Sequence, residues 1–422
     1  MIKSLLRVLG FLCLTACAAD LPPLVLTEGM GVNIHFVRGH TRDLDMIRDA
    51  GFRFIRMDFG WHATEFKRGE YSWADYDELT ANLEKRGIRP LYILDYSNPL
   101  YEQAMASTNP ISHKATFETA SPQHPESVAA FARWAAAAAA HYKGRRVIWE
   151  IWNEPNIFFW KPKPNAEQYA TLALATAKAI RAADPDASII GPASSGFPWE
   201  FLEIFLKSGV LDYLDGVSVH PYRSRNKSPE TAVADFARLR VLIKKYAPPD
   251  SKRKWPIISG EWGYSSHRMN VSTEAQAAFL VRQQLSNLLD GIPLSIWYDW
   301  KNDGEDPDEN EQNFGTVSYN LEPKPVYHAA QTLSRQLAGY SIARRIHAGA
   351  TNDFVLALTK PGAPAKLAAW TQGEPHSIVL EPALHLHKAR AVSIDGKPAD
   401  FSATGETVSL RIERAPIYVT EE

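Results

Sequence analysis

The chain has 422 residues, with 46 Lys and Arg against 48 Asp and Glu and a formal net charge of −2. This balance excludes an electrostatic attachment to nucleic acid or to an anionic membrane surface as the main activity. A hydrophobic fraction of 45%, with 11% aromatic and 22% charged residues, is typical of a folded globular protein. A largely disordered chain and a coiled coil are therefore excluded as the main architecture, and the length allows a large core with more than one domain.

The first residues are predicted to be an export signal and not part of the fold. The apolar run Leu5–Leu14 follows a basic start and is too short to span a bilayer as a stable anchor. Leu14-Thr15-Ala16-Cys17 resembles the lipobox of bacterial lipoproteins, which implies that residues 1–16 are removed and that Cys17 is lipidated. An ordinary secretory signal is the alternative, because the same site fits a small-x-small cleavage rule.

Either route predicts an exported protein, located in the periplasm or attached to the outer membrane through a lipid on Cys17, with residues 17–28 as a tether. Both cysteines of the chain, Cys13 and Cys17, lie in this leader region. The mature protein can therefore form no intramolecular disulfide, and its stability must come from core burial. A cysteine nucleophile and a zinc site built on thiolates are excluded for the same reason.

Beyond the tether, short apolar runs alternate with helical patterns along the chain. The predicted strands are Gly31–Phe36, Phe52–Asp58, Arg89–Leu94, Val147–Ile151, Ser188–Gly191, Gly216–Val219, Ile257–Gly260 and Leu294–Tyr298. The predicted helices are Thr41–Ala50, Asp75–Arg86, Pro125–Tyr142, Asn165–Ala183, Trp199–Ser208, Pro229–Tyr246, Thr273–Leu289 and Val326–Leu337. Several of the helices are followed directly by glycine, for example Gly51 and Gly87, where a left-handed C-cap favours this residue.

Eight strands, each followed by a helix, predict an α/β fold, the (β/α)8 TIM barrel, over residues 29–338. The strands are apolar enough to be buried on both faces. An open doubly wound sheet is the alternative, but no glycine-rich phosphate loop follows the first strand to support a nucleotide-binding version of it.

After the barrel the helical periodicity stops, and short alternating runs predict a small antiparallel, sandwich-like β domain over residues 339–422. The expected strands are Phe354–Thr359, Lys366–Trp370, Ser377–Leu380, Arg390–Ile394, Thr407–Ile412 and Ile417–Thr420. We expect this domain to pack on the barrel as a structural support, with carbohydrate binding as the alternative.

Two glutamates end strands that lie opposite each other in the predicted barrel. Glu154 follows strand four in Trp152-Asn153-Glu154-Pro155, and Glu261 follows strand seven in Gly260-Glu261-Trp262. Because active sites of such barrels lie at the carboxyl ends of the strands, both glutamates should face one cleft. Two carboxylates that converge on a cleft are the equipment for cleaving a glycosidic bond. Glu150, inside strand four, is expected to be a buried and paired structural carboxylate.

These two motifs resemble those of the clan A retaining glycoside hydrolases, in which the acid/base ends strand four and the nucleophile ends strand seven. Within the clan the sequence is most similar to family 39, and there to bacterial hydrolases of Psl-type biofilm exopolysaccharide. The resemblance covers the barrel from Gly31 to Leu337. It implies an O-glycosyl hydrolase with a retaining mechanism, for which the two carboxyl groups should lie roughly 5–5.5 Å apart.

The resemblance also implies roles for individual residues. Glu154 is the expected acid/base and Glu261 the expected nucleophile. The supporting residues expected from it are Arg56 beside the nucleophile, Asn153 at the sugar 2-hydroxyl, His220 and Tyr222 of the motif His220-Pro221-Tyr222 at the two glutamates, and Trp297 as the aromatic floor under the sugar. His35 is a further candidate sugar contact, for which a core histidine is the alternative.

The many aromatic residues near the strand ends, Trp160 and Trp262 among them, favour a long stacking groove and an endo-acting enzyme with a polysaccharide substrate. The alternatives are another clan A glycosidase (a β-glucanase, mannanase or xylosidase) and a non-catalytic polysaccharide-binding protein, against which the pair of glutamates argues.

The acidic segment Asp299–Glu311 raises the question of a calcium loop. Lys301 occupies the third position of that loop, where an oxygen ligand belongs, so a solvated rim loop is the preferred interpretation. We expect no metal, no cofactor and no nucleic-acid partner, a membrane contact only through the lipid on Cys17, and a monomer.

Overall fold

The computed structural model describes residues 20–108, 115–380, 389–404 and 407–421. The predicted signal peptide and the lipidation site Cys17 lie outside the described residues. Eight parallel strands close into a barrel in the order β1-β10-β9-β8-β7-β6-β3-β2. They are β1 (Met30–Asn33), β2 (Phe54–Gly60), β3 (Arg89–Asp95), β6 (Ile148–Ile151), β7 (Ser188–Ser195), β8 (Gly216–His220), β9 (Ile257–Trp262) and β10 (Ser295–Trp297). The predicted TIM barrel is confirmed, and the open sheet is excluded.

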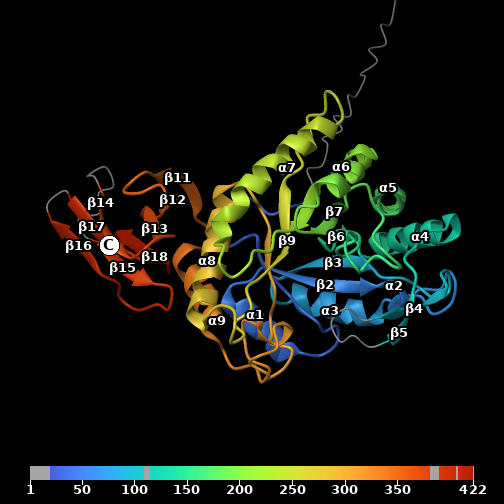
Figure 1. Cartoon of the computed structure of the whole chain (residues 1–422), viewed down its shortest axis with the longest axis horizontal. Helices are drawn as coiled ribbons and strands as arrows, with labels where there is room; N and C mark the ends of the chain where they lie inside the picture. The colour runs from blue at the N-terminus through green and yellow to red at the C-terminus, as the bar shows by residue number, and fades with distance from the viewer. Residues whose placement is uncertain (1–19, 109–114, 381–388, 405–406, 422) are drawn as a thin grey trace, which may run out of the picture.

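The helices alternate with these strands and surround the barrel (Figure 1). The helices that follow the eight strands are α1 (Thr41–Ala50), α3 (Ala74–Glu84), α4 (Pro125–His141), α5 (Ala166–Ala183), α6 (Trp199–Lys207), α7 (Val233–Tyr246), α8 (Thr273–Leu289) and α9 (Pro325–Leu337). The short helix α2 (Trp61–Thr64) and the 3-10 turns η1 (Val210–Asp212), η2 (Pro229–Ala232) and η3 (Glu311–Asn313) lie in the connections. Among the described residues, none of the helices combines the length and apolar character that crossing a bilayer requires.

Apolar side chains from six strands, and Leu294 directly before β10, fill the interior of the barrel. They are Phe54, Leu91, Ile93, Ile148, Ile190, Ile258, Leu294 and Ile296, each at most 2% exposed. Successive side chains of a strand point to opposite faces, so the residue two positions after an interior residue also faces the barrel axis, nearer the carboxyl end. This alternation places Arg56 after Phe54 and Glu150 after Ile148, and it builds a polar floor on top of an apolar core.

One hairpin in the barrel domain was not predicted. Strands β4 (Ala104–Thr108) and β5 (Ala115–Thr119) pair antiparallel in the connection after β3. Apart from Met105 and Phe117, the residues of both strands are small or polar and give little hydrophobic alternation, which explains the omission. An ion pair of 2.5 Å between Lys161 Nζ and Glu118 Oε2 ties the hairpin to the loop that follows β6.

The C-terminal segment forms two antiparallel sheets. One has the order β11 (Ser341–Ile346), β12 (Asp353–Thr359), β13 (Lys366–Thr371), β18 (Ile417–Glu421) and β15 (Ala389–Ser393), and the other the order β14 (His376–Leu380), β17 (Thr407–Ile412) and β16 (Phe401–Thr404). All six predicted strands are present, while β11 and β16 were missed. Both lie at sheet edges, and β11 carries Arg344 and Arg345, charges typical of edges that must not pair with another chain.

The five-stranded sheet is buried on both faces. One face packs on the three-stranded sheet through a cluster that includes Val355 and Leu410. The other face contributes Leu356, Trp370 and Tyr418 to the same core cluster as the barrel helices. This domain lies beside α8 and α9, at the left of Figure 1. Such two-sided burial agrees with the expected role as a structural support.

Candidate active site

Backbone geometry after β6 directs Glu154 into the barrel mouth. Trp152 and Glu154 adopt the left-handed region, with φ of 68° and 44°. Non-glycine residues rarely adopt this conformation, and it concentrates at functional sites, where the surrounding structure must hold it in place. Here the backbone N–H of Glu154 donates to the carbonyl oxygen of Ala193 on β7 at 3.0 Å. The Glu154 side chain is 10% exposed.

A β-bulge directs Glu261 to the same place. Strand β9 has two residues, Gly260 and Glu261, opposite the single residue of β10 between the pairs Ser259–Ser295 and Trp262–Trp297. An extra residue allows two neighbouring side-chain positions to face the same side of a sheet. A Cβ on Gly260 would lie 3.0 Å from Oε1 of Glu150, so only a glycine fits beside the glutamate without displacing a neighbour.

The two glutamates lie close together. One carboxylate oxygen of Glu154 and one of Glu261 are within 4.8 Å of each other, and a ring nitrogen of His220 is within the same distance of both. Retaining glycosidases place their carboxyl groups roughly 5–5.5 Å apart, and inverting ones roughly 6.5–9.5 Å, to leave room for a water molecule. The geometry therefore fits the retaining class.

Both oxygens of Glu261 are held by hydrogen-bond donors. The Tyr222 hydroxyl donates to Oε1 at 2.8 Å, and Nη1 of Arg56 donates to Oε2 at 2.6 Å. Arg56, 1% exposed, also donates from Nε to Glu150 at 2.7 Å and from Nη2 to Asn153 Oδ1 at 2.7 Å. Burial alone would lower the pKa of Arg56, but the charges of Glu150 and Glu261 raise it well above its usual value. The site thus has a permanent buried cation beside the nucleophile position, and Glu150 is a buried partner, as expected.

The hydrogen bonds around His220 define its tautomer. Its Nε2 atom lies 3.2 Å from Nη2 of Arg56, which can only donate, so Nε2 must be the acceptor. The proton therefore sits on Nδ1, 3.0 Å from Oε1 of Glu154 and 3.9 Å from Oε1 of Glu261. His220 is fully buried and donates this proton to Glu154 as a hydrogen bond.

Four further titratable groups, absent from the sequence prediction except for His35, lie at the ends of neighbouring strands. Asp58 lies two residues before the end of β2 and Asp95 ends β3, and their carboxyl groups are close enough to share a proton. Burial raises the pKa of both, and the negative charge of Asp58 raises the pKa of Asp95 further. His35 Nε2 lies 3.4 Å from Oδ2 of Asp299, which is 1% exposed. Burial lowers the pKa of His35, but its hydrogen bond to Asp299 and the charge of that carboxylate outweigh burial and raise it to about 9.

The expectation for Trp297 is wrong. Because Leu294 and Ile296 face the barrel interior, Trp297 faces the helix layer, where it is fully buried near Tyr264. The next residue, Tyr298, returns to the interior side. It is half-buried, packs edge-on against His35 with ring centroids 5.7 Å apart, and is close enough to Glu261 for that carboxylate to add to the effect of burial in raising the pKa of Tyr298. Counting alternation from Leu294 would have identified it.

The expectation that two other tryptophans contribute to a stacking groove is also wrong. Trp160 and Trp262 have no exposed surface, so neither offers a stacking face. Trp160 packs against Trp152 and Tyr169 in the core, and Trp262 pairs with Trp297 on the outward side of the sheet. Their positions follow from side-chain direction at the strand ends, which composition alone does not show.

An accessible aromatic surface lies beyond Glu154 instead. Tyr96 stacks on Phe159 with ring centroids 5.9 Å apart and an interplanar angle of 15°, and Phe159 contacts Phe158, which is 38% exposed. Asn153 Nδ2 donates to the Tyr96 hydroxyl at 3.1 Å, which links this surface to the catalytic centre. A chain of rings that begins at the centre and continues outward suits a substrate longer than one sugar.

The acidic segment is exposed along most of its length, as expected for a rim loop, except at its first residue. Asp299 directly follows the inward-facing Tyr298 and is buried. His35, Asp299 and Asp303 each have a potential ligand atom within 4.8 Å of the others, but no second feature of the site points to a metal. The segment therefore contributes both a solvated rim and one buried carboxylate of the site.

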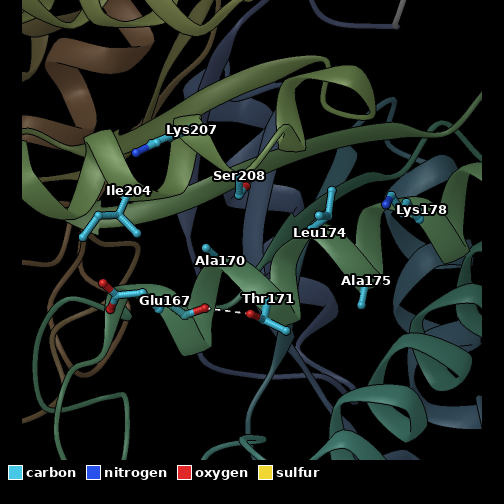
Figure 2. Close-up of a pocket in the computed structure, with 9 residues that line it drawn as sticks. All are labelled: Glu167, Ala170, Thr171, Leu174, Ala175, Lys178, Ile204, Lys207 and Ser208. Atoms are coloured by element: carbon cyan, nitrogen blue, oxygen red, sulfur yellow. Dashed lines mark hydrogen bonds between the residues drawn. The ribbon is translucent and has the colours of Figure 1, made fainter.

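A separate groove of about 670 Å³ lies between α5 and α6 on the outside of the barrel (Figure 2). Its walls are mainly aliphatic, with Lys178, Lys207 and Glu167 at its edges, and the Thr171 hydroxyl donates to the backbone carbonyl of Glu167. It is lined by none of the residues of the glutamate centre and has no pair of acidic groups, so it does not carry the chemistry described above.

Comparison with known proteins agrees with this geometry. The family model Cellulase (glycosyl hydrolase family 5) matches residues 27–304, about two thirds of the chain. The chain therefore belongs to this family of glycoside hydrolases, in clan A.

Within the clan the chain is most similar to family 39. A family 39 glycoside hydrolase from Bacteroides cellulosilyticus WH2 superposes with a TM-score of 0.79 and 26% identity, covering 95% of this chain and 81% of that one. A family 39 β-xylosidase from Caulobacter crescentus has the same fold, with a TM-score of 0.68 and 20% identity over 96% and 98% of the two chains.

Two β-xylosidases are similar in sequence. The Caldicellulosiruptor saccharolyticus enzyme is 24% identical over 70% of this chain and 64% of its own length. The Geobacillus stearothermophilus enzyme is 28% identical over 44% of this chain and 40% of its own. The chain thus spans less than two thirds of each of these relatives.

Proposed function

We propose that the protein hydrolyses glycosidic bonds of a polysaccharide with net retention of configuration. The observation that carries the proposal is the pair Glu154 and Glu261, with oxygens within 4.8 Å of each other at the mouth of a barrel. A polysaccharide-binding protein without turnover, the alternative, has no need of two facing glutamates or of a guanidinium that holds one of them.

The geometry suits a double displacement. Glu154 donates its proton to the glycosidic oxygen while the carbon–oxygen bond breaks and the Glu261 carboxylate attacks the anomeric carbon. The departing saccharide leaves as an alcohol, and the retained sugar is bound covalently to Glu261. Glu154 then accepts a proton from water, whose oxygen attacks the anomeric carbon and releases Glu261.

The surrounding residues assist this sequence by position. Arg56 and Tyr222 each hold one oxygen of Glu261, so the carboxylate keeps its orientation before and after attack. His220 donates to Glu154 and fixes the acid/base in the same way. Asn153, held by Arg56, is the residue proposed to contact the sugar 2-hydroxyl. Tyr298, not Trp297, is the aromatic residue proposed to lie against the sugar.

The proposed substrate is a bacterial exopolysaccharide of the biofilm type, cut within the chain. Support for endo action comes from the rings of Tyr96, Phe159 and Phe158, which extend away from the centre. A β-xylosidase is the second candidate, because two sequence relatives carry that name. A terminal glycosidase needs a closed pocket, and the exposed ring of Phe158 argues for an open path.

Export and lipidation are also proposed, on the basis of the leader sequence and Cys17. Labelling of cells with a lipid precursor should mark the wild-type protein, and a Cys17→Ser variant should remain unlabelled. We further expect a monomer; one structure of the same fold is described as a monomeric β-xylosidase from Caulobacter crescentus.

A fluorosugar label tests the mechanism. A 2-deoxy-2-fluoro glycosyl fluoride slows the second step and should leave a covalent adduct on Glu261, detected by mass spectrometry of a proteolytic digest. Glu261→Gln is the matched control and should stay unlabelled. A label on another carboxylate, or none with any sugar of a panel of xylosyl, glucosyl, mannosyl and galactosyl fluorides, would count against the proposal.

Product profiling then separates the two substrate candidates. Incubation with the host's own exopolysaccharide, xylan, β-glucans and mannans should yield a ladder of oligosaccharides from one polymer if action is endo. Release of single sugars from chain ends would favour the xylosidase type.

A further inference from the structure

The topology of the barrel divides the cleft into two halves. Glu154 follows β6 and must lie at the glycosidic oxygen, so the leaving saccharide extends over β6, β7 and β8. The sugar that becomes attached to Glu261 lies on the other side, over the consecutive strands β10, β1, β2 and β3. The side chains at the ends of these four strands therefore contact the attached sugar, which we call the glycone.

This side of the cleft, the glycone wall, consists of His35, Asp58, Asp95, Asp299 and Tyr298. Asp58 is half-buried and faces the interior by alternation from Phe54 and Arg56. Asp95 behind it has no exposed surface, and no N–H or O–H donor of another described residue reaches its oxygens except the carboxyl group of Asp58. The proton between the two carboxyl groups must therefore come from one of them.

The pair carries one negative charge. Asp95 holds the proton and donates it to one oxygen of Asp58, because burial and the charge of Asp58 raise the pKa of Asp95 well above its usual value. The second oxygen of Asp58 is directed by this hydrogen bond and remains an acceptor. Asp58 is half-buried at the mouth of the barrel, so part of the residue is accessible from the cleft.

The cations beside the wall are all engaged by other groups. Lys324, close to Asp299, donates to Ser266, Asn302 and the carbonyl oxygen of Asn313, and Lys301 lies over the ring of Tyr319. Arg56 donates to Glu150 and Glu261, and His35 lies against Asp299. Asp303 adds another negative charge close to the His35–Asp299 pair. The wall as a whole is acidic and rich in acceptors.

We infer that the glycone wall binds a neutral sugar, that Asp58 accepts hydrogen bonds from its hydroxyl groups, and that the wall excludes uronic acids. This inference rests on the proposed function and deepens it. A hydroxyl group gains a charge-assisted bond from the Asp58 carboxylate. A uronate carboxylate would meet like charge with no cation to pair with, which is costly in a partly desolvated site.

Substrate selectivity tests the first half of the inference. Neutral and uronic oligosaccharides of matched length, such as xylo- and cello-oligosaccharides against oligogalacturonate and oligoglucuronate, are titrated into a Glu154→Gln variant by calorimetry. We expect binding of at least one neutral series and about 10²-fold weaker binding of the uronic series. Comparable or preferred binding of uronic oligosaccharides would overturn the inference. Because this assay needs no turnover, its failure is distinguishable from failure of the fluorosugar label on Glu261.

A substrate–variant cycle tests Asp58 itself. Using the neutral saccharide so identified and analogues that lack one hydroxyl group of the glycone, kcat/KM is measured for wild type and Asp58→Asn. We expect Asp58→Asn to lose about 10–100-fold on the parent sugar, the range for a hydrogen bond to a charged group. On the deoxy analogue that removes the recognised hydroxyl, wild type and Asp58→Asn should become nearly equal. An equal loss on parent and analogues would show a merely structural role.

Asp95→Asn is the matched control for the second carboxyl group. An amide N–H can replace the acid proton as the donor to Asp58, so Asp95→Asn should lose less activity on the parent sugar than Asp95→Leu and should keep the preference for neutral over uronic saccharides. Asp95→Leu removes the donor and should resemble Asp58→Asn. If either Asp58→Asn or Asp95→Leu melts well below wild type, the deoxy analogues measured on wild type alone still decide. The inference is contradicted if removal of every single hydroxyl group lowers kcat/KM by less than 10-fold.

Discussion

His220 donates its Nδ1 proton to Oε1 of Glu154 across 3.0 Å, with its other nitrogen fixed as an acceptor by Arg56. The tautomer of the histidine is therefore set on one side by Arg56, which also holds Glu261, and its proton is directed to Glu154 on the other side. A single buried network connects both glutamates, although the residues come from β2, β6, β8 and β9.

This relationship predicts an effect of His220 that depends on the leaving group. His220→Ala should lower kcat/KM about 10–100-fold for saccharide leaving groups, because the negative charge that forms on Glu154 as it gives up its proton loses a hydrogen bond. Activated aryl leaving groups need little protonation and should be much less affected. His220→Asn, whose amide can occupy the Nδ1 position, should recover part of the loss. Steady-state kinetics on both substrate types makes the measurement, and an equal loss on both would contradict a role through Glu154.

Removal of the acid/base should change the products formed in the presence of azide. Glu154→Ala should lower turnover of substrates with saccharide leaving groups about 10²–10⁴-fold, the usual contribution of general acid–base catalysis. With an activated aryl glycoside, azide should enter the space of the lost carboxyl group and attack the glycosyl-enzyme. The expected product is a glycosyl azide of retained configuration, identified by NMR. Glu261→Ala with azide should instead give an inverted product, since azide then replaces the nucleophile.

Substitution of the two adjacent aromatic residues Trp297 and Tyr298 should affect different quantities, the stability for Trp297 and the kinetics for Tyr298. Tyr298→Ala should raise KM or lower kcat, on the order of 10-fold, because a ring contact beside the sugar is lost. Trp297→Phe should leave KM unchanged and lower the free energy of unfolding by about 0.5–3 kcal/mol, since it leaves a space between barrel and helices. Denaturant unfolding and kinetics on both variants check this. A KM effect of Trp297→Phe without a stability change would restore the original assignment.

A buried ion pair of the barrel domain, which also accepts a hydrogen bond from the β domain, should be costly to break. Arg282 and Glu230, 2% and 3% exposed, form two hydrogen bonds of 2.8 Å, and Trp370 Nε1 of the β domain donates to the same carboxylate at 2.7 Å. Arg282→Met should destabilise the protein by about 3–5 kcal/mol, because it leaves a buried charge unpaired.

The exposed pair Arg414–Glu374, with side chains 64% and 87% exposed, is the matched control. Arg414→Ala should cost no more than about 0–1 kcal/mol. Chemical denaturation measures both variants. A small effect of Arg282→Met would mean that the β domain supports the barrel through apolar contacts alone.

The His35–Asp299 pair predicts how stability depends on pH. The pKa of His35 is raised to about 9, because Asp299 outweighs the effect of burial, and burial raises the pKa of Asp299 as well. Both groups bind protons more tightly in the folded state, so the free energy of unfolding should fall as pH rises. The contribution of His35 is complete below its unfolded pKa of 6.5 and is lost as pH rises through about 9. The stability difference between wild type and His35→Asn should therefore shrink between pH 7 and pH 10, measured by denaturation at each pH. A constant difference would show that His35 stabilises by packing alone.

Local patterns in the sequence were enough to predict the fold and to identify the two glutamates. A buried parallel strand is a short apolar run, and an amphipathic helix repeats every 3.6 residues, so both are visible within a dozen residues. The segments Trp152–Pro155 and Gly260–Trp262 adjoin two such strands, and strand order in a closed barrel then places Glu154 opposite Glu261.

Tertiary structure alone decided which side chains the site contains. The sequence favoured Trp297, yet strand direction turned it outward and brought Tyr298 to the nucleophile. Asp58 and Asp95 look like ordinary strand-end acids until neighbouring strands bring their carboxyl groups into contact, and the Arg282–Glu230 pair meets Trp370 only when the domains pack. Burial, charge pairing and shared protons depend on distances between segments remote in the chain, and no local pattern encodes those distances.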